Sequence, residues 1–257
     1  MSRLFLAPFV LVFVLALACD SSQPPPPSIR IANLVPDSQA VDVCLKPGDL
    51  AAFGTPFVGG AGLSYPALSS RATVDAGTYS VRIVAGGATN CSTSLNGLGD
   101  ISNVQLGEGV IQTLAVLGRL TGTGSPSVAL GRFDDRTGGT PSGQVSMRAA
   151  NAAPGSNPED VGVVSGSLLN PFATAVSYGT ASAYQSIPIT AGATNVTAAL
   201  AARDSTDGTV WAQGTFSNIS DTGVYTLYVI GIPGQTGTAR PSLLLCSDSS
   251  VNCAQSP

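Results

Sequence analysis

Five cysteines carry most of the chemistry that this sequence offers, and the first of them is the most informative. Cys19 follows one basic residue, Arg3, an apolar run over residues 4–17 and the small residue Ala18. This order is typical of a bacterial secretion signal with its cleavage site. A cysteine at the first mature position is the residue that bacterial lipoproteins acylate to hold the chain on a membrane. We therefore predict a signal peptide over residues 1–18 and lipidation of Cys19.

The residues before Cys19 leave a second interpretation open. A lipoprotein signal normally has Leu three residues before the cysteine, and this position is Ala16. Ala16-Leu17-Ala18 also fits an ordinary A-x-A cleavage site at the same bond. Acylation of Cys19 leaves four thiols, an even number that suits disulfides in an oxidising compartment, and so favours the lipoprotein. A membrane-spanning anchor is not expected, because the apolar run is shorter than roughly 20 residues and Pro8 interrupts it.

The other four cysteines allow three disulfide pairings. Cys44 and Cys91 lie in the first half of the chain, whereas Cys246 and Cys253 lie together near its end. Pairing within each of these groups is the simplest arrangement, and it requires Cα atoms within about 7 Å. None of the four is in a C-x-x-C motif, so a redox enzyme is not indicated.

Missing residue types exclude several classes of function. The chain has no histidine, which rules out Ser-His-Asp and Cys-His nucleophile systems and His-ligated metals. Its single lysine, Lys46, lies in a Lys-Pro-Gly turn. The net charge of −4 and the pI near 4.6 offer no basic surface for nucleic acid. We therefore expect a protein that is not an enzyme, has no cofactor or metal, and binds no nucleic acid.

Acidic side chains are the candidate metal ligands in a chain without histidine. Asp134-Asp135 and the segment 204–208 are the acidic clusters, and neither has the spacing of a calcium-binding loop. Asp42 and Asp160 recur at one position of an internal repeat, and we interpret them as side chains that cap a turn. Tyr65 and Tyr178 also recur, and we interpret them, together with Trp211, as core residues rather than a glycan-binding surface.

The two halves of the chain repeat the same order of short segments rich in Val, Ile, Thr and Tyr, bounded by Gly, Pro, Asn and Asp. Such segments predict β-strands. The repeating unit is roughly 100 residues long, which is the size of a domain. The matched segments are, in order, Ile29–Pro36 with Met147–Pro154, Leu63–Tyr65 with Val176–Tyr178, Ile111–Gly118 with Val224–Gly231, and Pro126–Leu130 with Pro241–Leu245.

The repeated motifs resemble a known family, the bacterial domain of unknown function 4397. The shared features are an opening R-x-x-N-x-x-P followed by D-V, which starts at Arg30 and again at Arg148. An A-G-x-Y-x-V strand over residues 76–81 and a Y-T-L-x-V-x-G strand over residues 225–231 complete the pattern. The resemblance implies exported or surface-attached β-sandwich modules and implies no established activity.

We expect an all-β protein with two tandem immunoglobulin-like β-sandwich domains of about seven strands each. The predicted order is a signal peptide at 1–18, a Pro-rich tether at 19–28, domain 1 at 29–135, a linker at 136–144 and domain 2 at 145–257.

Two classes of function remain open. The first is a non-enzymatic cell-envelope lipoprotein with a structural or surface-binding role. It would be exported, lipid-anchored to the cell membrane or outer membrane, and face the periplasm or exterior. Its partners would be the membrane, through the lipid anchor, and an envelope component or surface protein. The alternative is a receptor for a small ligand or glycan, with a pocket between the two modules or under the loop over residues 47–62.

Overall fold

The computed structural model describes residues 24–48, 50, 52–121 and 126–256. Cys19 and the predicted signal peptide lie outside the described residues. Within them the chain is almost entirely β-structure, as expected, with two short 3-10 turns, η1 (Leu95–Gly97) and η2 (Gly237–Ala239). Among these residues, no helix has the length and apolar character needed to cross a membrane.

The first half forms two sheets, one of five strands and one of three. The larger has the order β3-β1-β7-β8, with β4 also paired to β1, and the smaller has the order β2-β5-β6. The strands are β1 (Ser28–Asn33), β2 (Val41–Pro47), β3 (Ala67–Leu68), β4 (Ala72–Thr73), β5 (Gly77–Ala85), β6 (Ile101–Leu106), β7 (Ile111–Leu117) and β8 (Ala129–Asp134).

The second half repeats this topology with two additions. Its sheets have the orders β12-β9-β15-β16-β17 and β11-β10-β13-β14, so β11 and β17 extend the arrangement of the first half. The strands are β9 (Gln144–Asn151), β10 (Glu159–Ser165), β11 (Leu168–Val176), β12 (Gln185–Pro188), β13 (Val196–Asp204), β14 (Val210–Ile219), β15 (Val224–Ile230), β16 (Ser242–Ser247) and β17 (Cys253–Gln255).

A parallel pair of strands lies at the centre of each larger sheet. β1 runs parallel to β7, and β9 runs parallel to β15 in the matching register. Each half has its own apolar core between its two sheets, centred on Leu114 and Val116 in the first half and on Leu227 and Val229 in the second. The sheets are therefore arranged as sandwiches, as the sequence pattern indicates. The proposed domain boundaries stay a prediction.

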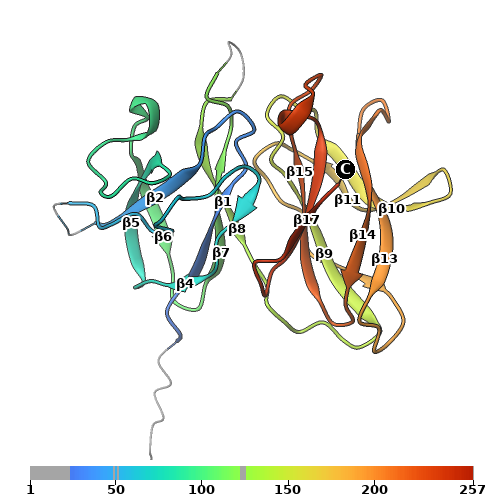
Figure 1. Cartoon of the computed structure of the whole chain (residues 1–257). Coiled ribbons are helices and arrows are strands. Elements are labelled where there is room, and N and C mark those ends of the chain that lie inside the picture. The colour runs from blue at the N-terminus through green and yellow to red at the C-terminus, as the bar shows by residue number, and fades with distance from the viewer. Residues whose placement is uncertain (1–23, 49, 51, 122–125, 257) are drawn as a thin grey trace, which may run out of the picture.

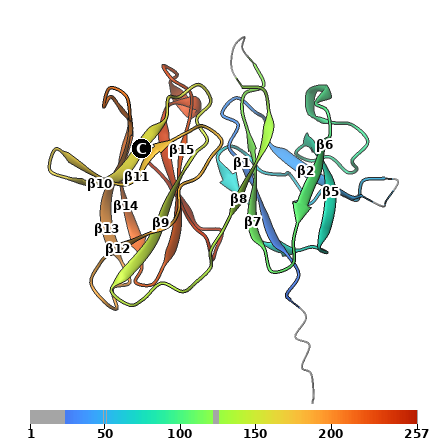
Figure 2. The ribbon, with the colours of Figure 1, turned by 180° about the vertical axis from the view of Figure 1, so that it is seen from behind.

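The two halves are packed together through their larger sheets (Figures 1 and 2), with β7 and β8 beside β9 and β15. A third apolar cluster fills this junction and draws side chains from both halves, among them Ala115, Phe133 and Tyr228. The rings of Phe133 and Tyr228 have centroids 6.1 Å apart. This junction explains why β7 and β15 are apolar on both faces. One face of each strand covers its own core, and the other covers the opposite half.

The alignment of the two halves that the sequence suggests is correct at their opening strands. Near the end of the repeat, the alignment is wrong by two residues. Strand β8 places Ala129 opposite Leu117, and β16 places Ser242 opposite Ile230. Ala129 therefore corresponds to Ser242, not to Leu244. A shift of two residues is easily missed, because it preserves the alternation of inward and outward side chains in a strand.

Truncation of a central core residue should destabilise the fold strongly. Leu227 has no exposed surface, so we expect Leu227→Ala to lower the free energy of unfolding by about 2–5 kcal/mol, because a cavity replaces the buried side chain. The control is Leu168→Ala, since Leu168 is 69% exposed and the same substitution there should cost less than about 0.5 kcal/mol. Urea unfolding measures both, and equal losses would contradict the assignment of the core.

Candidate functional site

Two arginines lie at equivalent positions in the junction between the halves. Arg30 is on β1 and Arg148 is on β9, and both are almost completely buried. The neighbours of Arg30 in the strand, Ile29 and Ile31, point into the first core. Side chains alternate along a strand, so Arg30 points the other way, toward the second half. A buried guanidinium requires acceptors and opposite charge.

Each arginine donates to a threonine of its own half. Arg30 Nε donates to Thr113 Oγ1 at 2.8 Å, and Arg148 Nε donates to Thr226 Oγ1 at 2.9 Å. These contacts arise because each arginine lies directly beside its threonine in the parallel strand pair. Because its oxygen accepts from the arginine, each threonine hydroxyl donates its own hydrogen to the aspartate of the same half.

Each arginine also forms an ion pair with the aspartate of the opposite half. Arg30 Nη2 donates to Asp248 Oδ1 at 2.7 Å, and Arg148 Nη2 donates to Asp135 Oδ1. The side chains of Asp135 and Asp248 have no exposed surface. The four charges thus make two reciprocal bridges that connect the sandwiches. We call Arg30, Arg148, Asp135 and Asp248 the junction cluster.

Backbone pairing shows that the two aspartates are equivalent. The Asp135 backbone N–H donates to the Ile111 carbonyl, and the Asp248 N–H donates to the Val224 carbonyl. Each aspartate also accepts from the threonine that lies 22 residues before it, at 2.6 Å for Asp135 and 2.9 Å for Asp248. The junction cluster is therefore a pseudo-two-fold arrangement.

One pair of equivalent positions breaks this symmetry. Arg71 Nη2 donates to Asp135, whereas the Tyr184 hydroxyl donates to Asp248. Burial and the adjacent Asp248 carboxylate raise the pKa of Tyr184, so its hydroxyl stays protonated and can donate. The Tyr184 ring also lies under the Arg148 guanidinium, 4.6 Å from its centroid. Asp135 thus has three arginines around it, and Asp248 has an arginine and a tyrosine.

The sequence interpretation considered Asp134-Asp135 only as a possible metal site, and the structure gives Asp135 a different role. Asp135 is an ion-pair acceptor in the junction, and Asp248 was not identified at all. The equal spacing from Thr113 to Asp135 and from Thr226 to Asp248 is the signal that would have found both. The two-residue error in the repeat concealed it.

The asparagines of the repeated R-x-x-N motif hold the turn that follows the first strand of each half. Asn33 Oδ1 accepts from the Val35 backbone N–H at 3.2 Å, and its Nδ2 donates to the Leu63 carbonyl at 2.9 Å. Asn151 makes the same contacts in the second half, with Ala153 and Val176. The motif therefore has a structural explanation in which the arginine connects the halves and the asparagine fixes the turn.

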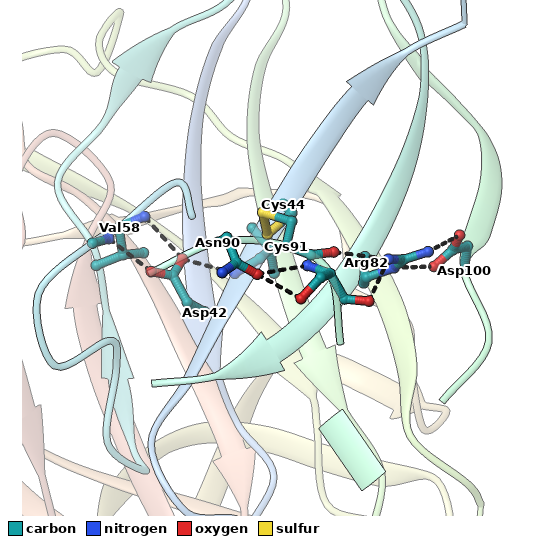
Figure 3. Close-up of a disulfide and its surroundings, with 10 residues drawn as sticks. Asp42, Cys44, Val58, Arg82, Asn90, Cys91 and Asp100 are labelled. Carbon is teal, nitrogen blue, oxygen red and sulfur yellow. Dashed lines mark hydrogen bonds and ion pairs between the residues drawn. A yellow bond between two sulfur atoms is a disulfide. The ribbon is translucent and has the colours of Figure 1, made fainter. Parts of the chain in front are cut away.

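A second polar region surrounds the first disulfide (Figure 3). Cys44 and Cys91 are joined as predicted, with Cα atoms 6.0 Å apart, and the bond attaches the loop before η1 to β2. Arg82 on β5 donates to both carboxylate oxygens of Asp100, at 2.7 and 2.8 Å, and to the Cys91 carbonyl. The hydrogen bonds of Arg82 hold together the loop segments on either side of η1.

A surface hollow of about 460 Å³ lies next to this disulfide. Its aromatic member is Phe53, whose ring lies 4.3 Å from Arg82 Cζ and 5.6 Å from Lys46 Nζ. Asn90 and Asp100 supply an amide and a carboxylate at its edge. The hollow therefore combines an apolar ring with cationic and polar groups, which is a chemistry suited to a polar ligand.

Asp42 is not among the residues that line this hollow. It accepts from the backbone N–H groups of Val43, Val58 and Gly59 at 2.7, 2.9 and 2.7 Å. Figure 3 shows it directed at Val58, on the other side of the disulfide from Asp100. Asp160 accepts from the Ala175 backbone N–H at 2.8 Å. Both aspartates accept backbone N–H groups beside a strand, but most of their donors lie 15–17 residues away and not in a local turn.

The other residues named from the sequence, the second cysteine pair and the aromatic residues, have structural roles. Cys246 and Cys253 are joined, with Cα atoms 4.1 Å apart, and this bond connects β16 to β17. Tyr65 and Tyr178 pack against the apolar cluster of the junction rather than inside a sandwich, while Trp211 packs against the second core. In the part of the chain that the structure describes, no group of three or more acidic or cysteine side chains is placed to hold a metal ion.

Removal of one charge from the junction cluster should be far more damaging than removal of a surface charge. Asp135→Asn leaves buried arginines without their partner, and we expect a loss of about 3–5 kcal/mol of stability. Asp100→Asn changes the same side chain in the Arg82 ion pair, where the two side chains are 22% and 33% exposed, and should cost at most about 1 kcal/mol. Urea unfolding of both variants tests this, and a similar loss in both would contradict it.

Comparisons with known proteins agree with the resemblance in sequence. A search of curated proteins gives no match. One similar solved structure is from Bacteroides thetaiotaomicron and is described as a candidate polysaccharide-binding protein of the DUF1812 group. It has 10% sequence identity, covers 90% of this chain and 98% of its own, and has a TM-score of 0.25, which is too low to support an argument. The model of DUF4397, a domain of unknown function, matches residues 27–162, which is just over half of the sequence and runs from the end of the tether through most of β10. The chain therefore belongs to the DUF4397 family.

Proposed function

We propose that this protein is a non-enzymatic, lipid-anchored component of the cell envelope, in which the two sandwiches act as one rigid module for structural or surface-binding work. The observation that carries the proposal is the junction cluster. Its reciprocal ion pairs are buried and join residues from opposite halves of the chain. Such an arrangement supports a fixed shape rather than a hinged pair of domains.

The energetics support the same proposal. Neighbouring domains are expected to move relative to each other unless their interface is large and apolar. Here an apolar cluster from both halves surrounds the ion pairs and excludes water from them. Separating the halves would expose this apolar surface and break the Arg30–Asp248 and Arg148–Asp135 bridges. A rigid body of this kind is suited to presenting a surface at a constant orientation above a membrane.

The state of the other cysteines supports lipid attachment at Cys19. Two disulfides use Cys44 with Cys91 and Cys246 with Cys253. Cys19 is the one cysteine outside these two disulfides, so no other cysteine is left to pair with it. This agrees with its position after a secretion signal, where the thiol is acylated. Pro24–Pro27 would then separate the first sandwich from the membrane by a semi-rigid spacer.

Substitution of Cys19 tests the anchoring. We expect Cys19→Ala to remove the acyl groups and to shift the protein from the membrane fraction to the soluble fraction, because no other anchor is proposed. Mass spectrometry of the mature N-terminus and fractionation of the envelope measure the two effects. The double variant Cys44→Ala, Cys91→Ala is the control and should remain in the membrane fraction. An unmodified Cys19 in the native protein, or a membrane-bound Cys19→Ala, would contradict the proposal.

The hollow beside the first disulfide favours a second candidate function, the binding of a small acidic ligand such as an acidic saccharide. Phe53 offers an apolar ring, and the ammonium of Lys46 can pair with a carboxylate of the ligand. This place includes residues 52–54, which belong to the loop under which the sequence predicts a ligand pocket. The other predicted place, between the modules, is occupied by the junction cluster and its apolar surround.

A charge variant at the hollow tests this candidate. We expect Lys46→Gln to weaken binding to an acidic glycan about tenfold or more, since a charge-assisted hydrogen bond contributes about 1.5–3 kcal/mol. Arg203→Gln removes a positive charge from the second half and is the control, with no change expected. A glycan array followed by calorimetry on the acidic glycan that binds gives the affinities. Equal binding by the native protein and Lys46→Gln would exclude the hollow as the site.

A further inference from the structure

One pair of positions differs sharply between the two halves. In the first half, Val41 on β2 lies opposite Ala85 on β5. The corresponding pair in the second half is Glu159 on β10 opposite Asp204 on β13. An apolar pair at the end of one sandwich is thus replaced by two carboxylates at the same place in the other. Like charges directly opposite each other in antiparallel strands are destabilising, so the replacement needs a compensating interaction.

Glu159 lacks such an interaction within the described chain. It has no exposed surface, and both of its carboxylate oxygens are buried without a hydrogen-bond partner. Val161 lies opposite Ala202 in the same strand pair, and both belong to the second core. Glu159 and Asp204 continue this row by one step toward the end of the sandwich. Their side chains therefore share one face of the sheet.

Asp204 is held as a carboxylate by its own turn. Its Oδ1 accepts from the Thr206 backbone N–H at 2.8 Å, and its Oδ2 accepts from Asn157 Nδ2 at 2.6 Å. Hydrogen bonds from the side chains of Thr206 and Asn157 lower the pKa of Asp204 to about 2. Asp160 and Asp207 add negative charge around Glu159. A permanent negative charge thus lies beside a buried carboxyl group whose two oxygens have no hydrogen-bond donor.

We propose that Glu159 and Asp204 form a binding site for a divalent cation of the calcium type at this end of the second sandwich. Two carboxylates supply hard oxygen ligands and the charge that neutralises a divalent ion. Calcium suits the site better than magnesium, since it accepts irregular geometry and water as additional ligands. A site with only two carboxylates should bind in the range typical of extracellular modules, about 0.1–1 mM.

The test is thermal unfolding of the full-length protein with millimolar calcium chloride or with EDTA, together with calcium titration by calorimetry. We expect calcium to raise the melting temperature of the native protein, because a ligand that binds only the folded state stabilises it. The control variant carries Glu159→Val and Asp204→Ala, the residues of the first half at these positions. It should be at least as stable as the native protein in EDTA and should not respond to calcium.

A pH series distinguishes a bound cation from a bound proton. Burial and the nearby carboxylates raise the pKa of Glu159 from 4.5 to about 8. The folded state therefore binds this proton more tightly than the unfolded state, so in EDTA stability should fall as the pH rises from about 4.5 through about 8. Calcium should abolish most of that decline in the native protein.

Two results would overturn the proposal. The first is a melting temperature and a pH series that millimolar calcium leaves unchanged, which would mean that Glu159 holds a proton and no cation. The second is an equal response to calcium in the Glu159→Val, Asp204→Ala variant, which would place calcium binding elsewhere. The native protein and the double variant are both tested as the intact chain, and the apolar residues introduced are those that the first sandwich already accommodates.

Discussion

The structure depends on the pairing of buried charges across the junction between its halves. Arg30 and Arg148 are held at the centre of the molecule, where an unpaired charge would be prohibitively unfavourable. Each is paired with the aspartate of the opposite half. Arg30 also lies 3.5 Å from Asp135 of its own half, but the shortest carboxylate contact of each arginine is with the opposite half. A buried ion pair contributes little net stability compared with an apolar contact, but loss of one partner is costly. The pairs consequently specify how the halves fit together more than they strengthen the fold.

The same constraint explains features on either side of it. The central strands β7 and β15 are apolar on both faces because one face covers a sandwich core and the other surrounds the ion pairs. The second disulfide joins β16 to β17 across a short loop that contains Asp248. Arg30 Nη1 also donates to the carbonyls of Ser247 and Ser250 in that loop. The carboxylate that completes the junction is thus held from both ends.

Duplication has left the two halves free to differ where the junction does not constrain them. Arg71 in one half corresponds to Tyr184 in the other, and both still donate to a buried aspartate. Away from the junction the differences are larger. The first half has a disulfide beside a polar hollow, and the second has two carboxylates where the first has an apolar pair. The two halves are alike at the junction and differ at their ends. This pattern fits a module that is rigid at its centre and carries its binding chemistry at its periphery.

The sequence alone determined the β-class and the internal repeat, indicated the family by resemblance, and favoured the correct disulfide pairing among three. These follow from local information, namely alternation of side chains, turn residues, repeated motifs and the positions of four cysteines. It also identified Asp42 as an acceptor of backbone N–H groups, although two of its three donors, Val58 and Gly59, belong to a loop that only the fold brings to β2. Only the tertiary structure decided that Asp135 pairs with Arg148 and Asp248 with Arg30. It also decided that Glu159 is buried opposite Asp204. Those contacts depend on which faces of distant strands pack together. The alternating pattern of a strand does not reveal the partner of each face, and it is unchanged when the strand is shifted by two residues.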